Sequence, residues 1–321
     1  MARGEAFDDV PTEKRLRVLS PADNRHIGVP HNSVSVETER SAPPWLRAVV
    51  PALVIVGLLA VLYGNVLRVL LADCWDDPNY SHAFLVPFFS GFLVWQRRRE
   101  LTALTPHGSW IGLPVLLAGI VMLLLGHLGG ELFLTRTSLI IVLAGLLLFH
   151  LGKPTFRELA FPLFFLFFMV PLPMIVFNAV AFPLQNLAAQ NAARTLDLFG
   201  IPVLLDGNVI HLSTISLGVT EACSGIRSLI SLFAVAIAWA YLSLPGMWGM
   251  AVLAAATVPI TVLANAGRVI VTGLVAQWLG VEYAQGLFHT FSGWVIFLVA
   301  MAGLLAVHGV IRLVQRRRTP A

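Results

Sequence analysis

The sequence predicts an all-α, polytopic membrane protein, and two observations lead to this fold class. Of the 321 residues, 57% are hydrophobic and only 12% are charged, whereas soluble domains are about 45–50% apolar and about 25% charged. The apolar residues also gather in runs of the length that crosses a bilayer, which is about 20 residues. This composition excludes a disordered chain, a secreted disulfide scaffold and a soluble nucleic-acid binder, so we expect no nucleic-acid partner.

Eight stretches are long and apolar enough to be predicted as membrane-spanning helices. They are residues 46–70, 78–97, 109–127, 133–152, 158–179, 224–243, 249–277 and 291–313. The second begins at Asp77-Pro78, an N-cap residue followed by a proline at the first helical position. The fifth contains Pro171-Leu172-Pro173, which predicts a kink or an end of the helix there.

Basic residues are distributed unevenly between the two predicted faces of the membrane. If both termini are cytoplasmic, 16 of the 21 Lys and Arg residues fall in cytoplasmic segments. This asymmetry satisfies the positive-inside rule with an even number of spans. The opposite face collects acidic residues, namely Asp73, Asp76, Asp77, Glu131, Asp197, Asp206, Glu221 and Glu282. We therefore expect two cytoplasmic termini.

Three segments lie outside the spans of the transmembrane domain, which we place at residues 45–315. Residues 1–44 are polar and predict a disordered cytoplasmic tail, and residues 316–321 form a basic cytoplasmic end. The long loop, residues 180–222, is predicted to be extracytoplasmic. Within it, residues 185–199 are predicted to form an amphipathic helix on the membrane surface that ends at Gly200. Asp206-Gly207 then predicts a β-hairpin.

A small set of reactive and ionisable residues lies at the outer ends of the predicted spans. Placing an ionisable group at the centre of a membrane span costs at least about 2.5–3.5 kcal/mol of free energy. Each such residue is therefore expected to have a structural or functional role. Cys223 and Arg227 open the sixth span, and their spacing of four places them on one helix face. Arg268 lies in the outer half of the seventh span, His289 starts the eighth, and His82 lies in the first turn of the second.

Each member of this set also has a purely structural interpretation. A lone membrane cysteine is most often a packing residue, and an interfacial histidine is more often solvated than catalytic. An arginine near a helix end commonly extends to the lipid headgroups, which we expect of Arg68 and Arg136. Arg268 fits this explanation less well, because it lies well inside an apolar span. The convergence of a thiol, two guanidinium groups and an imidazole at one depth favours a functional site.

The chemistry that suits this set is nucleophilic attack by a thiol. A thiol attacks as the thiolate, which is favoured beside a cation or a helix N-terminus, and Cys223 would have both. His289 could take the thiol proton and return it to a leaving amine. Arg268 could stabilise the oxyanion of a tetrahedral intermediate or pair with the thiolate. The spacing therefore suggests intramembrane acyl transfer or proteolysis that needs no cofactor and no metal.

Two other interpretations of the same residues remain open at this point. Cys74 and Cys223, both on the oxidising face, could form a structural disulfide. A transporter could use Arg227 and Arg268 to bind an anionic substrate at broken helices. Against a transporter, the sequence has no inverted repeat, and its polar residues cluster at one surface rather than at the midplane.

Five strings of the sequence together resemble the exosortase/archaeosortase family. They are Asn79-Tyr-Ser-His-Ala-Phe-Leu-Val-Pro87, Val170-Pro-Leu-Pro173, Glu221-Ala-Cys-Ser-Gly-Ile-Arg227, Asn265-Ala-Gly-Arg-Val269 and Phe288-His289. They occur in the order of that family, and the resemblance covers roughly residues 45–315. Cys-Ser-Gly-Ile-Arg at the start of a span, followed by Asn-x-x-Arg and a later histidine, is a specific combination.

The resemblance implies a cysteine protease or transpeptidase of the bacterial inner membrane, with its active site facing the periplasm. By position it implies Cys223 as the nucleophile, Arg268 as the catalytic arginine and His289 as the histidine partner. The matching residues in supporting positions are Arg227, His82, Glu221 and Asn265. Ala83 follows His82 where the family often has glycine, which weakens the case for a role of His82.

The resemblance also implies the substrates and partners. They are membrane-anchored exported proteins that end in a short signal such as Pro-Glu-Pro, one spanning helix and a basic cluster. The substrate helix would place the scissile bond at the outer interface, close to Cys223. The basic cluster would hold that helix in register across the bilayer.

Overall fold

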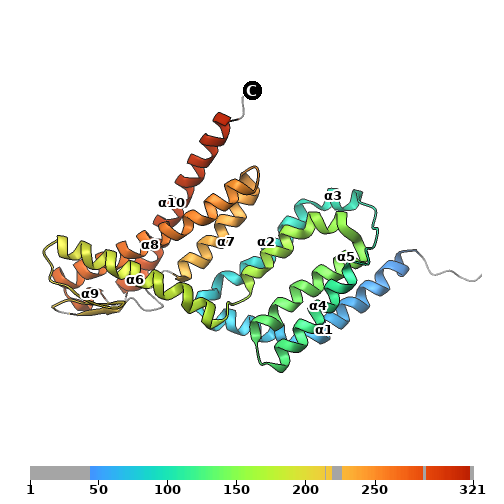
Figure 1. Cartoon of the computed structure of the whole chain (residues 1–321), viewed down its shortest axis with the longest axis horizontal. Coiled ribbons are helices and arrows are strands. Elements are labelled where there is room, and N and C mark those ends of the chain that lie inside the picture. Colours follow the sequence, from blue (N-terminus) through green and yellow to red (C-terminus); the bar gives the residue numbers. More distant parts are fainter. Residues whose placement is uncertain (1–43, 214, 219–225, 285–286, 319–321) are drawn as a thin grey trace, which may run out of the picture. The chain divides into compact units, whose positions relative to one another are not determined.

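The computed structural model describes residues 44–213, 215–218, 226–284 and 287–318. The chain divides into two units, residues 1–54 and 55–321. Everything that follows on packing and on the site concerns the second unit. Helices dominate the described residues, which confirms the predicted fold class (Figure 1).

The described elements follow one another along the chain as mostly long helices, with a small sheet between α6 and α7. They are α1 (Pro44–Asp76), η1 (Pro78–Phe84), α2 (Leu85–Gln96), α3 (Arg98–Ala103), α4 (Gly112–Leu128), α5 (Leu132–Phe165), η2 (Leu166–Met169), α6 (Met174–Leu198), β1 (Leu204–Asp206), β2 (Val209–His211), β3 (Ser216–Gly218), α7 (Ile226–Ser243), α8 (Met247–Trp278), α9 (Val281–Ala284) and α10 (Leu287–Arg318).

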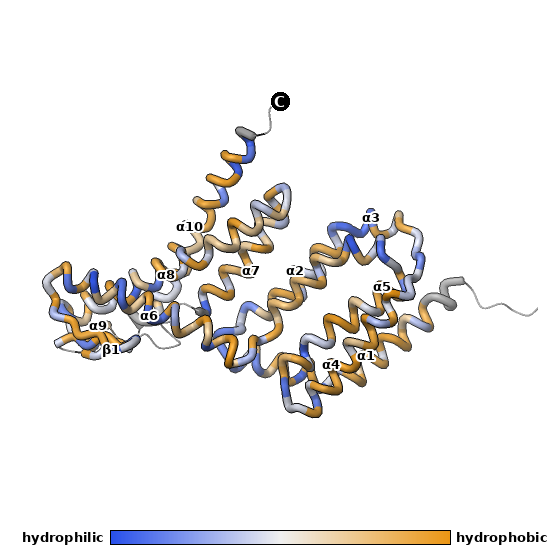
Figure 2. The backbone as a smooth tube through the Cα atoms, in the orientation of Figure 1, coloured by the Kyte–Doolittle hydropathy of each residue, from blue (hydrophilic) through white to orange (hydrophobic). Residues whose placement is uncertain are grey.

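Within the described residues, four helices are long and apolar enough to cross a membrane. They are Val49–Asp76, Leu132–Met169, Met247–Trp278 and Phe291–Arg316. Figure 2 shows the hydrophobic colouring running along α1, α4 and α5, with hydrophilic residues around α3. Two shorter apolar helices, Gly112–Leu128 and Arg227–Ser243, accompany them. The chain is therefore a multi-pass membrane protein, while the count of eight spans and the cytoplasmic termini stay predictions.

The predicted second span begins differently from the expected α-helix. Its first seven residues form a 3-10 helix, η1, and the α-helix α2 that follows has only 12 residues. The predicted start is confirmed, because the Asp77 side chain accepts a hydrogen bond from the Asn79 backbone N–H at 2.8 Å. The 3-10 geometry places the Asn79–His82 string in a compact turn beside the first turn of α2.

The predicted fourth and fifth spans correspond to the two helical segments of α5, which non-helical backbone at Gly152 separates, so the predicted break between them is confirmed. The chain bends at Gly152, whose φ of +81° strongly favours glycine. A β-carbon there would also lie 1.9 Å from the His107 carbonyl oxygen. The second segment continues through η2 to Met169 and ends directly before Pro171-Leu172-Pro173, where the sequence predicted a kink or an end, so the span stops short of residue 179. It ends at Met169 because Val170 precedes a proline, which disfavours helical backbone, and Val170 is extended.

Helix α6 is longer than the surface helix predicted within the extracytoplasmic loop. It begins at Met174, directly after the Pro171-Leu172-Pro173 turn, and ends at Leu198 before Gly200, as predicted. The buried face of α6 packs against other parts of the protein. That core consists of Ala189, Ala192, Ala193, Leu196, Ile201, Ile210, Leu212 and Val269. Helix α6 is therefore docked on α8 and the small sheet.

The predicted hairpin at Asp206-Gly207 is confirmed. Strands β1 and β2 pair antiparallel with Asp206 opposite Val209, and Gly207 in the two-residue turn has a φ of +58°. Strand β3 extends the sheet to three strands in the order β1-β2-β3. This third strand was not predicted, because a three-residue strand is too short to give an alternating pattern.

Helices α4 and α5 pack through small residues. Gly112, Gly119 and Gly126 recur every seven residues along α4, and each contacts the α5 backbone or a side chain close to it. On the α5 side, a β-carbon at Gly145 would lie 2.5 Å from the Leu116 backbone nitrogen. Such close approach is the usual way in which helices associate within a membrane, where van der Waals contact replaces the hydrophobic effect.

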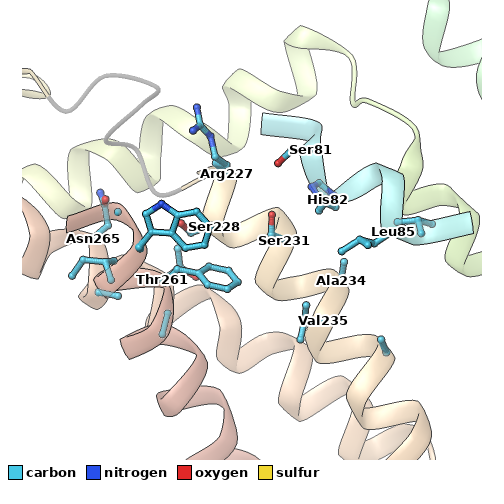
Figure 3. A pocket seen from close by; sticks show the side chains of 18 of the residues that line it. Ser81, His82, Leu85, Arg227, Ser228, Ser231, Ala234, Val235, Thr261 and Asn265 are labelled. Carbon is cyan, nitrogen blue, oxygen red and sulfur yellow. The ribbon is translucent and has the colours of Figure 1, made fainter. Parts of the chain in front are cut away.

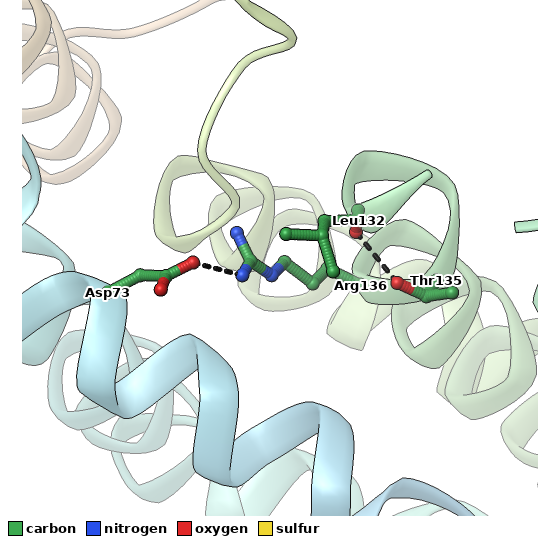
Figure 4. A network of polar contacts seen from close by, with 4 residues as sticks. All are labelled: Asp73, Leu132, Thr135 and Arg136. Carbon is green, nitrogen blue, oxygen red and sulfur yellow. Dashed lines mark hydrogen bonds and ion pairs between the residues drawn. The ribbon is translucent and has the colours of Figure 1, made fainter. Parts of the chain in front are cut away.

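Arg136 does not extend to the lipid headgroups, so that prediction was wrong. The side chain is only 4% exposed and forms an ion pair with Asp73 of α1 (Figure 4). A guanidinium withdrawn from water needs such a partner, because an uncompensated buried charge is strongly destabilising. Arg68, for which the same prediction was made, is exposed.

Replacing Gly145 by alanine should weaken the α4–α5 pair. The added β-carbon meets backbone atoms that cannot rotate away, so we expect a loss of about 1–3 kcal/mol in stability. Gly91→Ala is the control, because nothing lies within 4 Å of a β-carbon at this helical position. The measurement is the melting temperature in detergent together with abundance in the membrane. Equal behaviour of the two variants would contradict close packing at Gly145.

Candidate active site

A cavity of about 870 Å³ lies between η1, α2, α5, α7, α8 and α10. One part of its wall is polar, and the rest is apolar. The polar residues are Ser81, His82, Arg227, Ser228, Ser231, Thr261, Asn265 and Arg268. Figure 3 shows Ser81 and His82 of η1 on one side of α7, and Asn265 of α8 on the other.

The cavity brings together four of the residues that the sequence singled out. His82, Arg227, Asn265 and Arg268 come from three different elements and all line it. Their separation along the chain is large, so only the packing of η1, α7 and α8 around one space places them together. Two cationic side chains therefore share one cavity in an otherwise apolar bundle.

Arg227 is held in the first turn of α7 by a residue of η1. Its Nε donates a hydrogen bond to Asn79 Oδ1 at 3.2 Å. The side chain is exposed, which leaves the guanidinium accessible from the cavity. Asn79 thus links the Asn79–His82 string to the start of α7, three residues after the position of Cys223.

Arg268 is oriented by the first turns of α10. Its Nε donates a hydrogen bond to Ser292 Oγ at 3.2 Å, and Ser292 is buried. The neighbouring Gly293 lies beside the guanidinium, and a β-carbon there would be in ordinary contact with Arg268 Nη2, at 3.7 Å. Asn265, one turn earlier on α8, is 3% exposed.

His82 lines the cavity from η1 with a half-buried side chain. Both ring nitrogens are buried, and the backbone of Asn79 and Phe168 lies close to the ring. The ring therefore belongs to the packed part of the cavity wall between η1 and the turn after α5.

The remaining predicted site residues lie outside what the structure describes. Cys223 and Glu221 fall in residues 219–225, which are not described, and α7 begins at Ile226. His289 belongs to the first turn of α10, but its side chain is outside the description. Gly293, which lines the cavity, follows it at a spacing of four, so the two positions share one helix face.

Cys74 has a packing role. It is a free, buried thiol that packs with Leu70, Tyr80 and Ala83. The alternative of a structural disulfide with Cys223 involves a residue that lies outside the described part of the chain. The packing of Cys74 also explains Ala83, which is 1% exposed and fills this cluster with its methyl group.

Side-chain contacts also join α2, α5 and α7 at a distance from the polar part of the cavity. Arg97, which follows α2, forms an ion pair with Glu158 of α5 and lies over the ring of Tyr241 of α7. Phe161 of α5 stacks on the same ring, with centroids 3.5 Å apart. These contacts fix three of the helices that line the cavity.

Sequence reasoning missed Thr261 and Ser292 as members of the site. Thr261, Asn265 and Arg268 follow the i, i+4, i+7 spacing of one helical face, so the periodicity of α8 could have identified Thr261. Ser292 carries no comparable signal, because nothing in the sequence pairs it with a residue 24 positions earlier.

The comparison with known families finds one match. A family model described as transmembrane exosortase matches residues 74–306 of the chain, which is more than two thirds of its length. No curated protein and no solved structure matches the chain.

The cavity makes a prediction about chemical accessibility on α7. In a background that lacks both native cysteines, Ser231→Cys should react with a water-soluble maleimide, because Ser231 lines the cavity. The adjacent Leu232→Cys should not react, because Leu232 is 0% exposed in the core between α7, α8 and α10. Labelling is read as a mass shift. Equal labelling of the two variants, or none at Ser231→Cys, would contradict an open cavity.

Proposed function

The chain belongs to the transmembrane exosortase family, and we propose that it cleaves C-terminal sorting signals of exported, membrane-anchored proteins. In this proposal it is a cysteine-type peptidase or transpeptidase of the bacterial inner membrane. Cleavage takes place at the extracytoplasmic face, and Cys223, Arg268 and His289 carry the reaction.

The observation that supports the proposal best is the cavity that Arg227 and Arg268 share with His82 and Asn265. Arg227 is four residues after Cys223, at the spacing that places two residues on one helix face. Two cations beside a thiol favour the thiolate, which is the form that attacks a carbonyl carbon. The same cations favour the negative charge that develops on the carbonyl oxygen in the transition state.

The proposed reaction proceeds through an acyl-enzyme. The Cys223 thiolate attacks the scissile carbonyl carbon, and the resulting oxyanion is stabilised by the Arg268 guanidinium. His289 returns a proton to the leaving amine, the C–N bond breaks, and a thioester remains on Cys223. Water or an acceptor nucleophile then attacks the thioester and releases the processed protein with a new C-terminus.

The two arginines are each held by a residue of another element. Ser292 of α10 accepts a hydrogen bond from the Nε of Arg268. Asn79 of η1 accepts one from the Nε of Arg227 through its amide oxygen. A guanidinium oriented in this way at a fixed position suits electrostatic stabilisation of a transition state.

The height of Arg268 along α8 agrees with cleavage near a membrane boundary. Arg268 is 21 residues after Met247, where α8 begins. At 1.5 Å per residue this corresponds to roughly 31 Å, close to the thickness of a bilayer's hydrocarbon core, about 30 Å. A substrate anchored by one spanning helix would present its scissile bond at such a boundary.

The two cysteines should respond differently to substitution. Cys223→Ala should abolish cleavage of a co-expressed, C-terminally tagged substrate, because it removes the nucleophile. Cys74→Ser should retain cleavage, because Cys74 is a packing residue. Loss of the tag is followed by immunoblotting of membranes. Continued cleavage by Cys223→Ala would overturn the assigned nucleophile, and uncleaved substrate with wild-type enzyme would overturn the proposed function.

Arg268→Lys should fail as a catalyst while the protein still accumulates. An ammonium group lacks the planar, forked donors of guanidinium, and losing one oxyanion donor typically lowers turnover about a hundred- to a thousandfold. Cleavage per molecule of membrane-embedded enzyme is the quantity to measure. The opposite pattern, near-normal turnover of Arg268→Lys and poor accumulation of Arg268→Ala, would assign Arg268 to the fold.

A further inference from the structure

Thr261 lines the cavity and carries a buried hydroxyl without a partner among the described residues. The residue is 4% exposed and lines the cavity. Its Oγ1 has no hydrogen-bond partner within the described residues. A buried polar atom of this kind is destabilising unless something pairs with it. The position of the hydroxyl therefore points to a ligand that supplies the missing hydrogen bond.

Three polar residues form a stripe along α8, and Thr261 lies at its N-terminal end, in the apolar part of the cavity. Thr261, Asn265 and Arg268 occupy one helical face at a spacing of four and then three. Seven residues separate Thr261 from Arg268, which is roughly 10 Å along the helix. At the N-terminal end of the stripe the cavity wall includes Val235 and Phe297.

A peptide main chain fits this stripe better than an apolar chain does. A hydrocarbon tail offers no hydrogen bond to Thr261, whereas a polypeptide offers an N–H or a C=O at every residue. Extended backbone advances about 3.3 Å per residue, so roughly three residues cover the distance from Arg268 to Thr261. The hydroxyl can serve as donor or acceptor.

Cleavage next to a spanning helix requires a hydrogen-bonding group of the enzyme near the substrate backbone. A peptide bond becomes accessible to a nucleophile only when the adjoining turn of helix unwinds. The backbone groups freed by unwinding then lie in an environment without water, where each must find a partner in protein.

We propose that Thr261 is a positioning residue that hydrogen-bonds the main chain of the unwound substrate segment, about three residues to the C-terminal side of the scissile bond. This inference rests on the proposed cleavage function. Arg268 and Cys223 act at the scissile bond itself, while Thr261 fixes how far the substrate helix is opened.

Thr257 provides a matched control on the same helix, one turn earlier. It is 0% exposed, and its hydroxyl donates a hydrogen bond to the Ala254 carbonyl at 2.6 Å. Threonine and valine are close in size, so Thr261→Val and Thr257→Val each remove a hydroxyl with little change in shape. Only the first removes an unpaired hydroxyl from a residue that lines the cavity.

The test uses full-length enzyme in proteoliposomes and a synthetic, tagged membrane substrate. For Thr261→Val we expect KM to rise about three- to tenfold, as for one neutral hydrogen bond, with kcat within twofold of wild type. Thr261→Ser should restore KM, and Thr257→Val should leave it unchanged. The melting temperature of Thr261→Val should equal or exceed that of wild type, because an unpaired buried hydroxyl has been removed.

A second measurement locates the contact on the substrate. Single backbone ester bonds, which remove one N–H and weaken one carbonyl acceptor, are placed two, three and four residues after the scissile bond. Wild-type enzyme should lose most affinity for the ester at the third residue, and Thr261→Val should not discriminate among the three.

Several outcomes would overturn the inference without touching the proposed function. They are an unchanged KM for Thr261→Val, a lowered melting temperature with a normal KM, equal effects of Thr257→Val, or an ester scan without a maximum. Failure of the wild-type enzyme to cleave any substrate, with Cys223→Ala as the blank, would instead overturn the proposed function and this inference with it.

Discussion

The tight contact of α7, α8 and α10 at one end of these helices is the constraint on which the cavity depends. Small and branched apolar side chains close this contact. They are Leu232, Ala236, Ala240, Leu244, Leu253, Ala264, Ala300 and Leu304. Alanine allows helix backbones to approach closely. The same helices also line the cavity, where Ala264 and Ala300 of this contact adjoin arginine, asparagine and serine side chains.

The arginines of the bundle are of two kinds, distinguished by what they contact. Arg136 and Arg97 form ion pairs with Asp73 and Glu158, and these pairs join helices to one another. Arg227 and Arg268 donate their Nε hydrogens to neutral oxygens on other elements. An ion pair offsets the charge that it holds, whereas a neutral acceptor only orients it. The first two arginines therefore contribute to helix packing, while the second two line the cavity.

Helix α6 and the small sheet contribute structure to the C-terminal half of α8. The alanine face of α6 and the small sheet bury Val269, the residue after Arg268, in a common core. Leu196 of α6 also lies against Gly273 of α8. These contacts support the backbone of α8 around Arg268, and Ser292 of α10 holds the Arg268 side chain. The backbone around Arg268 is therefore supported by residues that the sequence pattern assigned to a surface helix and a loop.

The sequence alone determined those features that depend on neighbouring residues. The helical membrane class, the start at Asp77-Pro78, the end of α6 before Gly200 and the hairpin at Asp206-Gly207 follow from apolar runs, caps and turn residues within a few positions. The strings that resemble the family also include Arg227, Arg268, Asn265 and His82, and all four line the cavity.

Only the tertiary structure decided which distant residues meet. Asp73 and Arg136 are 63 positions apart, and no local signal indicated that this arginine would be buried against a carboxylate. The role of Thr261 depends on which face of α8 borders the cavity, and that is set by how α7 and α10 pack on α8. Local patterns specify conformation and burial, but the pairing of polar groups across helices depends on three-dimensional packing.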